Sequence, residues 1–506
     1  MSTAASRYHP QQPDSKHTHR SEALPMFQPS FESLSHYVCP DWFRDAKFGI
    51  WSHWGPQSVP MYGDWYARNM YLEGSDQYLY HLRHYGHPSE FGYLDLCGLW
   101  RAENWDPAEL MSLYRRAGAR YFVAQATHHD HFFNYDSALH PYNSVRIGPG
   151  RDICAEWQQA ARAENLPFGL SEHLGASFSW WAVTKGHDRT GPFAGVPYDG
   201  TWPGRRDFYH PNEEHVAPDM RHVDPWYTKN ERFRSFWLDV MHELIDRFHP
   251  DLLYTDGALP FGRIREDEPG APDFRYGLEA VSCFYNDSIR RHGSNQAVYT
   301  QKDPRARIHS VGVLDIEKSQ LPDIASSPWQ TDTCIGNWFY DVRQRFKTPG
   351  HVIDILIDVV SKNGTLLLNV LQKPDGSIDA ETRWLLEELA GWFRIAGEAI
   401  HGTRPWERYG EGPSTVLIEG FREDEVAWTE TDFRFTCRGS TVYAFVMGEP
   451  EGRALVLQSF RGKDIAAVRL LGAGDCRWQS FAGILTVELP GRLPTPYRNV
   501  LAIELA

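Results

Sequence analysis

The chain has 506 residues, of which 42% are hydrophobic and 23% are charged. These proportions are close to globular averages and exclude a wholly disordered chain, a collagen-like repeat and a coiled-coil rod. Acidic residues outnumber basic ones by 66 to 51, which gives a formal net charge of −15, and no basic block compensates for this excess. Nucleic-acid binding through phosphate contacts is therefore not expected. The length predicts several domains, or one large barrel with an appendage.

The N-terminal stretch is polar, rich in Pro, His and Ser, and lacks the apolar core of a signal peptide. We expect a disordered head over residues 1–25 and a cytoplasmic protein without a membrane span. The seven cysteines are far apart and form no C-x-x-C pair. This spacing predicts that most of them are buried reduced thiols, and predicts neither a disulfide scaffold nor a zinc knuckle.

Short apolar runs alternate with helical patterns, which is typical of a parallel sheet crossed by helices. The predicted strands are Ala46–Ser52, Arg120–Ala126, Pro167–Ser171, Leu252–Thr255, Ala297–Thr300, Val313–Ile316 and Thr365–Val370. The predicted helices are Asp152–Glu164, Phe233–Phe248, Leu278–Arg291, His351–Ser361 and Asp379–Ile400. Asp379 is the expected N-cap of the last helix. Seven strands of this kind predict a (β/α)8-like (TIM) barrel of the α/β class, with one strand unassigned.

After Gly402 the pattern changes to short alternating strands separated by glycines. Such a pattern predicts a C-terminal antiparallel β-sandwich domain. We therefore expect a catalytic barrel over residues 26–402 and a β-sandwich over residues 403–506. The sandwich region has few clustered ionisable groups, so we expect it to have a packing or auxiliary binding role.

In a barrel of this type, chemistry takes place at the carboxyl ends of the strands. The residues that follow the predicted strands are Ser52-His53, Thr127-His128-His129-Asp130-His131, Glu172-His173, Asp256-Gly257 and Glu317-Lys318. Paired carboxylates there could hydrolyse a glycosidic bond, with one attacking and the other protonating the leaving oxygen. Alternatively, the histidines and nearby acids could bind a divalent metal that activates water. Neighbouring His128 and His129 would point to opposite faces of a strand, and no H-E-x-x-H motif is present, which weakens the metal hypothesis.

Longer motifs favour the first alternative. The stretch Trp42–Gly55 reads WFRDAKFGIWSHWG, and further motifs follow it in order along most of the chain. They are Ser58-Val59-Pro60, Asp64-Trp65-Tyr66, Thr127–Asp130, Tyr135-Asp136-Ser137, Asn143-Ser144, Gly148–Asp152, Pro250–Gly257, Asp358–Gly364, Leu366–Val370, Gly402–Trp406 and Gly410–Pro413. In content and order these motifs resemble those of the α-L-fucosidases of glycoside hydrolase family 29.

The resemblance implies a retaining exo-glycosidase, built as a barrel followed by a β-sandwich, that needs no cofactor or metal. It also implies a fucosylated oligosaccharide or glycoconjugate as substrate. Net charge and the lack of a long apolar stretch predict no nucleic-acid or membrane partner, and a homo-oligomer is left open. Asp256 is then the nucleophile. Its place directly after an apolar strand fits this role independently, because a rigid strand end can aim a carboxylate at a sugar.

The acid/base residue lies in a variable region of the family. Glu317 ends a predicted strand and precedes Pro328–Thr333, which resembles the family's segment just after the acid/base, so we predict Glu317 for this role. Retention requires the two carboxyl groups to be about 5–5.5 Å apart. Glu172 is the second choice, followed by Asp315 and Asp332. A purely structural ion pair of Glu317 with Lys318 or an arginine is the competing interpretation.

Matching positions with the family extends the site to a substrate pocket. Position matching implies that His53, Asp64, Trp65, His128, His129, Tyr254 and Arg305 bind substrate. Glu172, from its place after a predicted strand, and Trp338, from its residue type, complete the predicted set. Tyr254 is expected under the sugar ring, and Arg305, with Arg307 as an alternative, near the acid/base. Trp338 or Phe339 is expected to accept the C6 methyl group.

Several positions depart from the family pattern, namely Asp64, His131, Gln330 and the run Ser171-Glu172-His173. The preference for fucose and the linkage cleaved therefore stay open. A glycosidase with another sugar preference, such as an α-L-galactosidase, and a catalytically silent fucose-binding protein remain the alternative functions.

Overall fold

The computed structural model describes residues 26–262, 273–416, 418 and 423–506, so the predicted head over residues 1–25 lies outside the described part. Eight parallel strands form a closed barrel in chain order, and β8 pairs with β1. The strands are β1 (Phe48–Ser52), β2 (Phe122–Gln125), β3 (Phe168–Glu172), β4 (Leu252–Thr255), β5 (Val298–Gln301), β6 (Val313–Asp315), β7 (Trp329–Cys334) and β8 (Gly364–Asn369). The predicted TIM-type barrel is confirmed.

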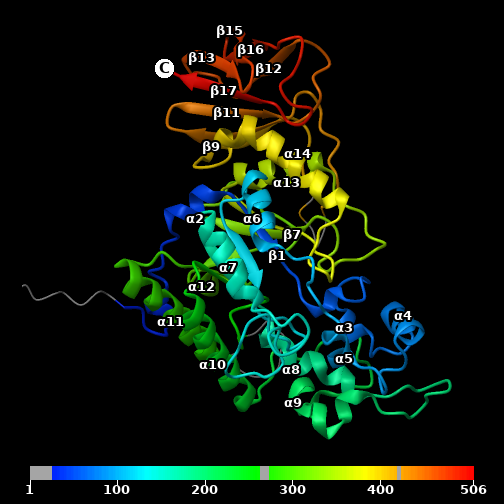
Figure 1. Ribbon diagram of the computed structural model, residues 1–506. Helices are drawn as coiled ribbons and strands as arrows, with labels where there is room; N and C mark the ends of the chain where they lie inside the picture. The colour runs from blue at the N-terminus through cyan, green and yellow to red at the C-terminus, as the bar shows by residue number, and fades with distance from the viewer. Residues whose placement is uncertain (1–25, 263–272, 417, 419–422) are drawn as a thin grey trace, which may run out of the picture.

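The five predicted helices are present, with ends that differ by a few residues. They are α7 (Ile153–Ala163), α10 (Glu231–Phe248), α11 (Arg275–His292), α13 (Pro349–Ser361) and α14 (Ala380–Ala396). Asp379 caps α14 as predicted, because its Oδ1 accepts a hydrogen bond of 2.8 Å from the backbone of Thr382. A cap of this kind is worth about 1 kcal/mol. Helices α10 and α11 lie side by side on the barrel (Figure 1).

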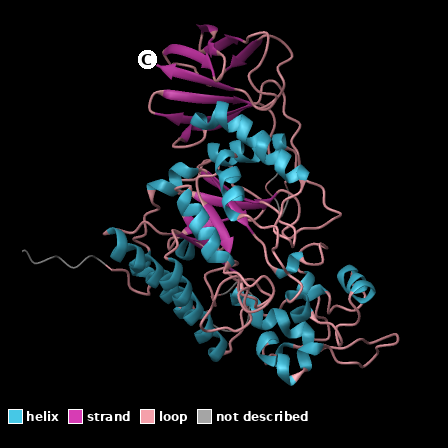
Figure 2. Cartoon of the chain, in the orientation of Figure 1, coloured by secondary structure: helices cyan, strands magenta, loops and turns pink. Residues whose placement is uncertain are grey.

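The remaining helices are shorter. They are α1 (Phe31–Leu34), α2 (Asp41–Ala46), α3 (Tyr66–Asn69), α4 (Asp76–His84), α5 (Tyr93–Cys97), α6 (Pro107–Arg116), α8 (Ser177–Trp180), α9 (Arg206–Tyr209) and α12 (Ala306–His309). Figure 2 shows that many of them are joined by long irregular segments. In the part of the chain that the structure describes, no helix combines the length and the apolar character needed to cross a membrane.

Strand β7 is the one that the sequence did not predict. Its residues read WQTDTC, and all six are buried, including Gln330 and Asp332. Gln330 Oε1 accepts a hydrogen bond of 2.9 Å from Tyr121, and its Nε2 donates one of 2.8 Å to Asp315. The strand is polar because its inward side chains belong to a buried hydrogen-bond network, so it shows no apolar run.

The C-terminal region forms two antiparallel sheets, as predicted for this part of the chain. One has the strand order β14-β13-β17-β11-β10-β9 and the other the order β12-β16-β15. The strands are β9 (Arg404–Glu411), β10 (Phe433–Arg438), β11 (Thr441–Val446), β12 (Ala454–Leu457), β13 (Ile465–Leu470), β14 (Gly474–Asp475), β15 (Arg477–Phe481), β16 (Ile484–Glu488) and β17 (Val500–Leu505). Buried apolar side chains, including Trp406, Phe435 and Phe460, form their own core.

The C-terminal sheets pack on the barrel through α13 and α14, which separate the two parts of the molecule in Figure 1. Arg434 of β10 forms a buried ion pair with Asp358 of α13. Trp392 Nε1 of α14 donates a hydrogen bond of 2.9 Å to the carbonyl of Arg498. Breaking a buried pair such as the first one costs about 3–5 kcal/mol, which ties the two domains together.

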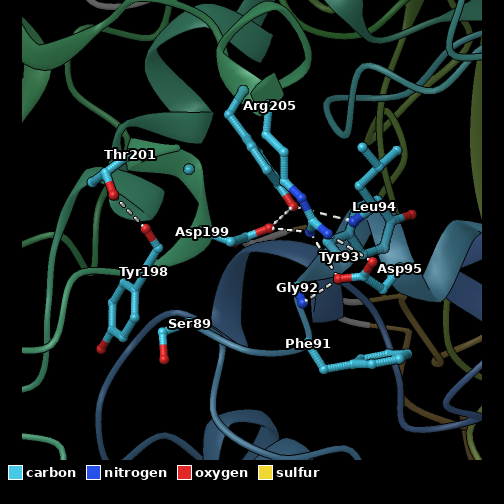
Figure 3. A network of polar contacts seen from close by, with 12 residues as sticks. Ser89, Phe91, Gly92, Tyr93, Leu94, Asp95, Tyr198, Asp199, Thr201 and Arg205 are labelled. Carbon is cyan, nitrogen blue, oxygen red and sulfur yellow. Dashed lines mark hydrogen bonds and ion pairs between the residues drawn. The ribbon is translucent and has the colours of Figure 1, made fainter. Parts of the chain in front are cut away.

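A polar network fixes the long connection between β3 and α10 against α5 (Figure 3). Arg205 lies between Asp95 and Asp199, with a hydrogen bond of 2.7 Å to each. Asp199 also accepts hydrogen bonds from Tyr71 (2.7 Å) and Tyr209 (2.8 Å). These contacts satisfy a fully buried carboxylate, and they hold the connection against the segment between β1 and β2.

Candidate active site

A cavity of about 310 Å³ opens at the carboxyl ends of the barrel strands. It is lined by Trp51, His53, Asp64, Trp65, His128, His129, His173, Trp226, Tyr254, Asp256, Lys302, Glu317, Asp332 and Trp338. The structure therefore brings together both predicted catalytic carboxylates and seven of the nine predicted substrate contacts. The roles assigned to these residues stay predictions.

Lys302 lies at the centre of the charged side of the cavity. Its Nζ atom is 3.1 Å from Asp256 Oδ1, 2.5 Å from Glu317 Oε2 and 3.5 Å from Asp332 Oδ2. The three carboxylates together raise the pKa of Lys302 well above its ordinary value, although burial opposes this. A permanent ammonium group thus bridges the carboxylates.

Asp256 directly follows β4, and its side chain is 16% exposed towards the cavity. Its backbone N–H donates to the carbonyl of Glu172, and Gly257 at φ 96° turns the chain away from the strand. Burial opposes ionisation, but Lys302, His129 and His173 outweigh it and hold the pKa of Asp256 well below its ordinary value. Asp256 is therefore a carboxylate at neutral pH.

Glu317 follows the short strand β6 and is 24% exposed. Besides the contact with Lys302, its Oε1 accepts a hydrogen bond of 3.0 Å from Trp338 Nε1. The indole of Trp338, predicted as an apolar wall, thus also positions a carboxylate. Both oxygens of Glu317 have a donor, which fixes the orientation of the side chain.

Asp332 and Asp315 form a buried acid pair beneath these two residues. Oδ1 of Asp315 accepts a hydrogen bond of 2.8 Å from Gln330, whereas Oδ2 of Asp315 and Oδ1 of Asp332 have no hydrogen-bond partner among the described residues. Burial raises the pKa of Asp332 to about 6, and burial together with Asp332 raises the pKa of Asp315. Asp332 Oδ2 also accepts a hydrogen bond of 3.0 Å from Tyr254. Neither residue is as accessible as Glu317, because Asp332 is 1% exposed.

Three histidines form another wall. His53, His128 and His173 are buried, and their ring centroids are 4.8–5.0 Å apart. Burial lowers the pKa of each, so all three are neutral at physiological pH. Nδ1 of His53 and Nδ1 of His173 have no hydrogen-bond partner among the described residues. Neutral imidazoles of this kind can donate to and accept from hydroxyl groups.

The same three histidines are also the residues that could hold a metal ion, since one nitrogen of each lies within 4.8 Å of the others. This set differs from the group His128, His129 and His131 considered from the sequence. His131 lies apart from the cavity lining and packs against His140 and His210. His128 and His129 both line the cavity because β2 ends at Gln125, so strand alternation does not apply to them.

Asp64 and Trp65, from the connection between β1 and β2, also line the cavity, and the ring of Trp65 lies edge-on to His129 with a centroid distance of 5.9 Å. Trp65 adopts a left-handed backbone conformation (φ 55°), and its N–H donates a hydrogen bond of 2.8 Å to Asp64 Oδ1. Burial raises the pKa of Asp64 to about 7. Trp226 stacks on Trp65 with a centroid distance of 6.3 Å, which extends the aromatic wall.

Glu172 and Arg305, both predicted to bind substrate, do not line the cavity. Glu172 is the last residue of β3 and its carboxylate accepts hydrogen bonds from Trp237 Nε1 (3.1 Å) and from the backbone of Leu174 (2.8 Å). It faces α10 because Ser171, the residue before it, faces the barrel interior. Arg305 pairs with Asp303, to which its Nε donates at 2.8 Å.

Arg307, the alternative to Arg305, and Phe339, the alternative to Trp338, are not among the residues that line the cavity. The guanidinium of Arg307 stacks on the ring of Phe31 at 4.1 Å. Phe339 is buried behind the cavity wall, against the rings of His53 and His128.

The sequence interpretation assigned no role to Lys302, Trp51, Trp226 or His173 in the pocket. Lys302 immediately follows β5, so the rule that selected Asp256 could have found it. Trp51 is an inward-facing strand residue whose indole donates a hydrogen bond to Ser171. Trp226 comes from the long connection between β3 and α10 and carries no local signal.

Comparisons with known proteins agree with this geometry. A family model described as Alpha-L-fucosidase matches residues 15–398. The tissue alpha-L-fucosidase of Rattus norvegicus is 26% identical over 464 residues, covering 89% of this chain and 86% of the rat protein. The Homo sapiens protein is also 26% identical, over 472 residues, with coverage of 91% and 87%. The crystal structure of Thermotoga maritima alpha-fucosidase in complex with fucose matches with a TM-score of 0.71 at 24% identity, covering 94% of this chain and 100% of that chain.

Proposed function

We propose that this chain, which belongs to the α-L-fucosidase family (glycoside hydrolase family 29), removes terminal α-L-fucosyl residues from oligosaccharides or glycoconjugates with retention of configuration. The observation that carries the proposal is the contact of both Asp256 and Glu317 with Lys302. Oδ1 of Asp256 and Oε2 of Glu317 lie 3.1 and 2.5 Å from the same Nζ atom of Lys302. The distance between these two oxygens cannot exceed the sum of those values. So short a distance favours a retaining enzyme, in which the two carboxyl groups are about 5–5.5 Å apart, over an inverting one, in which they are about 6.5–9.5 Å apart.

In the first step, a carboxylate oxygen of Asp256 attacks C1 of the fucosyl residue. The bond from C1 to the glycosidic oxygen breaks, and Glu317 transfers its proton to that oxygen. The products are a fucosyl ester on Asp256, an ionised Glu317 and the released aglycone. The ammonium of Lys302 lies 2.5 Å from Glu317 and stabilises the negative charge that forms there.

In the second step, Glu317 takes a proton from a water molecule whose oxygen attacks C1. The ester bond to Asp256 breaks, and the carboxylate of Asp256 and the acid form of Glu317 are restored. Lys302 also contacts Asp256 at 3.1 Å, so it stabilises the carboxylate that leaves in this step. Two displacements at the same carbon give a product with the configuration of the substrate.

The walls of the cavity suit one terminal sugar. Its volume of about 310 Å³ is at the small end of ligand pockets, which are about 300–1,000 Å³. The neutral rings of His53, His128 and His173 offer donors and acceptors for sugar hydroxyls, and two of their nitrogens lack a partner among the described residues. Trp338 and Trp65 offer flat apolar faces for the ring and its methyl group.

The decisive experiment is to follow hydrolysis of an aryl α-L-fucoside by proton NMR from the first turnover. We expect the α anomer of fucose to be released first, followed by slow mutarotation. Initial release of the β anomer would contradict the paired roles of Asp256 and Glu317. Saturable fucose binding without any turnover would instead indicate a silent binding protein, and faster turnover of an α-L-galactoside would change the sugar assignment.

A further inference from the structure

Two described residues between β9 and β10 of the C-terminal domain, Ile418 and Glu423, contact the barrel beside the active site. Ser319, two residues after Glu317, donates a hydrogen bond of 3.0 Å to the carbonyl of Ile418. Thr333 of β7 donates one of 2.6 Å to Glu423 Oε2. Lys347 Nζ lies 2.9 Å from the same oxygen of Glu423. The appended domain thus contacts both loops that carry the acid/base side of the rim.

Glu423 contacts both ends of the loop that carries Trp338, residues 335–347, through Thr333 and Lys347. The loop begins at Ile335, whose carbonyl accepts a hydrogen bond of 2.7 Å from the backbone of Lys347. The Lys347 ammonium also donates to the carbonyl of Cys334 at 2.7 Å. The side chains of Glu423 and Lys347 are only 11% and 14% exposed, so water screens this ion pair little.

Further contacts join this loop to Glu317, the proposed acid/base. The carbonyl of Trp338 accepts a hydrogen bond of 2.9 Å from Asn369 Nδ2, and its indole Nε1 donates one of 3.0 Å to Glu317. The indole has only one N–H, so its direction fixes the position of the Glu317 carboxylate. A shift of the loop would move this donor away from Glu317.

Lys318 adds an electrostatic link along the same path. Its ammonium lies 5.0 Å from the ring centroid of Trp338, which is a cation–π distance. Burial lowers the pKa of Lys318, but Cys334, Glu423 and Glu317 outweigh this and raise it above its ordinary value. The charge of Glu423 therefore acts on the group that stacks on Trp338.

We propose that Glu423 of the C-terminal domain is a positioning residue for acid/base catalysis, because it clamps Thr333 to Lys347 and so holds Trp338 against Glu317. The inference rests on the proposed role of Glu317. It gives the C-terminal domain a direct part in the chemistry, beyond the packing role expected from its sequence.

The test uses the dependence of turnover on the leaving group. Phenyl α-L-fucoside needs protonation of its leaving oxygen, whereas 2,4-dinitrophenyl α-L-fucoside does not. We expect Glu423→Ala to lower kcat/KM for the phenyl substrate about 10-fold, as a fraction of the 10²–10⁴ or so that general acid catalysis supplies. We expect a change below about 2-fold for the dinitrophenyl substrate, since it does not use the acid.

Two further variants keep the test informative. Glu423→Gln retains an oxygen that can accept from Thr333 and Lys347, so it should recover most of the lost activity. Thr333→Val removes one side of the clamp and should repeat the leaving-group effect if Glu423→Ala fails to fold. The matched control is Glu425→Gln, which changes an acid of the same segment whose side chain is 67% exposed and 3.6 Å from His351. It should leave both substrates unaffected.

An equal loss on the two substrates, or no loss on either, would overturn the positioning role and leave a clamp that only stabilises the fold. Glu317→Ala is measured in parallel. If Glu317→Ala shows a strong leaving-group effect and Glu423→Ala shows none, only the inference about Glu423 fails. If Glu317→Ala shows no such effect, the acid/base assignment fails and the inference about Glu423 fails with it.

Discussion

Asp256 and Glu317 face each other across Lys302, but differently built parts of the molecule hold them. Asp256 follows β4, which pairs along most of its length with β3 and β5, and its own N–H continues the ladder to Glu172. Glu317 follows β6, which has three residues and pairs with β5 and β7 at two positions each. Beyond β6, the backbone N–H groups of Ile316 and Lys318 donate to the carbonyls of Gln330 and Asp332 on β7, at 2.9 Å each. Backbone hydrogen bonds therefore reach the first carboxylate from the neighbouring strands on both sides, and the second from the β7 side.

Side chains and a second domain add further support to the second carboxylate, Glu317. Trp338 and Lys302 both donate to Glu317, and the segment around Glu423 holds the loop that carries Trp338. A support of this kind is assembled from parts of the chain that are far apart. The difference suggests that substitutions away from the cavity should affect acid catalysis more readily than nucleophilic attack.

The largest effect is expected from Asp256→Ala. Turnover of an aryl α-L-fucoside should fall by at least about 10³-fold, because the group that attacks C1 is lost. Azide should restore part of the rate and give a β-fucosyl azide, since a small anion can occupy the space left by the carboxylate. Circular dichroism should show an intact fold, because Asp256 lies after its strand.

The same variant separates the carboxylate mechanism from a metal-dependent one. A chelator should leave the parent enzyme active, and His128→Asn should be less damaging than Asp256→Ala. Loss of activity with chelator, together with a larger effect of the histidine substitution, would instead assign catalysis to a metal held by His53, His128 and His173.

Glu317→Ala is expected to have the next largest effect, and one that depends on the substrate. The rate should fall about 10²–10⁴-fold for poor leaving groups and much less for 2,4-dinitrophenyl fucoside, because only the former need a proton. The measurement is kcat/KM over a series of aryl fucosides. Asp332→Asn serves as the comparison; an equally strong leaving-group dependence there would assign the acid to the buried pair.

The sequence could predict the locally supported side of the rim and little of the other. The apolar run before Asp256 predicts both the strand and the place of the carboxylate, and the family motifs agree. Strand β7 was missed because its inward residues, among them Gln330 and Asp332, are polar. The contacts of Glu317 with Trp338 and of Thr333 with Glu423 join residues far apart in the sequence, so no periodicity encodes them.

Glu172 shows a different limit of the sequence analysis. Its position at a strand end is correct, since it is the last residue of β3, but its side chain faces α10. Side chains alternate between the two faces of a strand. Assigning the inward-facing residues one position too early or too late therefore reverses the predicted direction of every side chain in the strand. The barrel and the β-sheet domain need no such precision, and both are confirmed.

Lys302→Met removes the cation that contacts both Asp256 and Glu317. We expect kcat/KM to fall about 10²-fold, as for other lost charge-stabilising groups. Lys302 is the main group that lowers the pKa of Asp256. Without it that pKa rises, Asp256 becomes protonated at higher pH, and activity should be lost earlier as the pH falls.

The acid limb of the kcat/KM profile measures this shift. Lys463→Met is the matched control, since Lys463 pairs with Glu407 in the C-terminal sheets. An unchanged acid limb in Lys302→Met would mean that Asp256 does not depend on this lysine for its ionised state.

The smallest effect is expected from Asp64→Asn. Burial raises the pKa of Asp64 to about 7, so the carboxyl is neutral and can donate to a sugar hydroxyl below that pH. Because the pKa in the folded state is raised, the favourable neutral form is present at low pH and is lost as the pH rises through about 7. Asparagine stays neutral at every pH and keeps a donor in the same place.

The expected result is a change of less than about 10-fold in kcat/KM below pH 7, with a weaker decline above it than in the parent enzyme. Glu425→Gln, an exposed acid away from the cavity lining, should keep the parent profile. A decline above pH 7 that persists unchanged in Asp64→Asn would assign it to another group. The titration of Asp64 would then have no part in binding, even though its side chain lines the cavity.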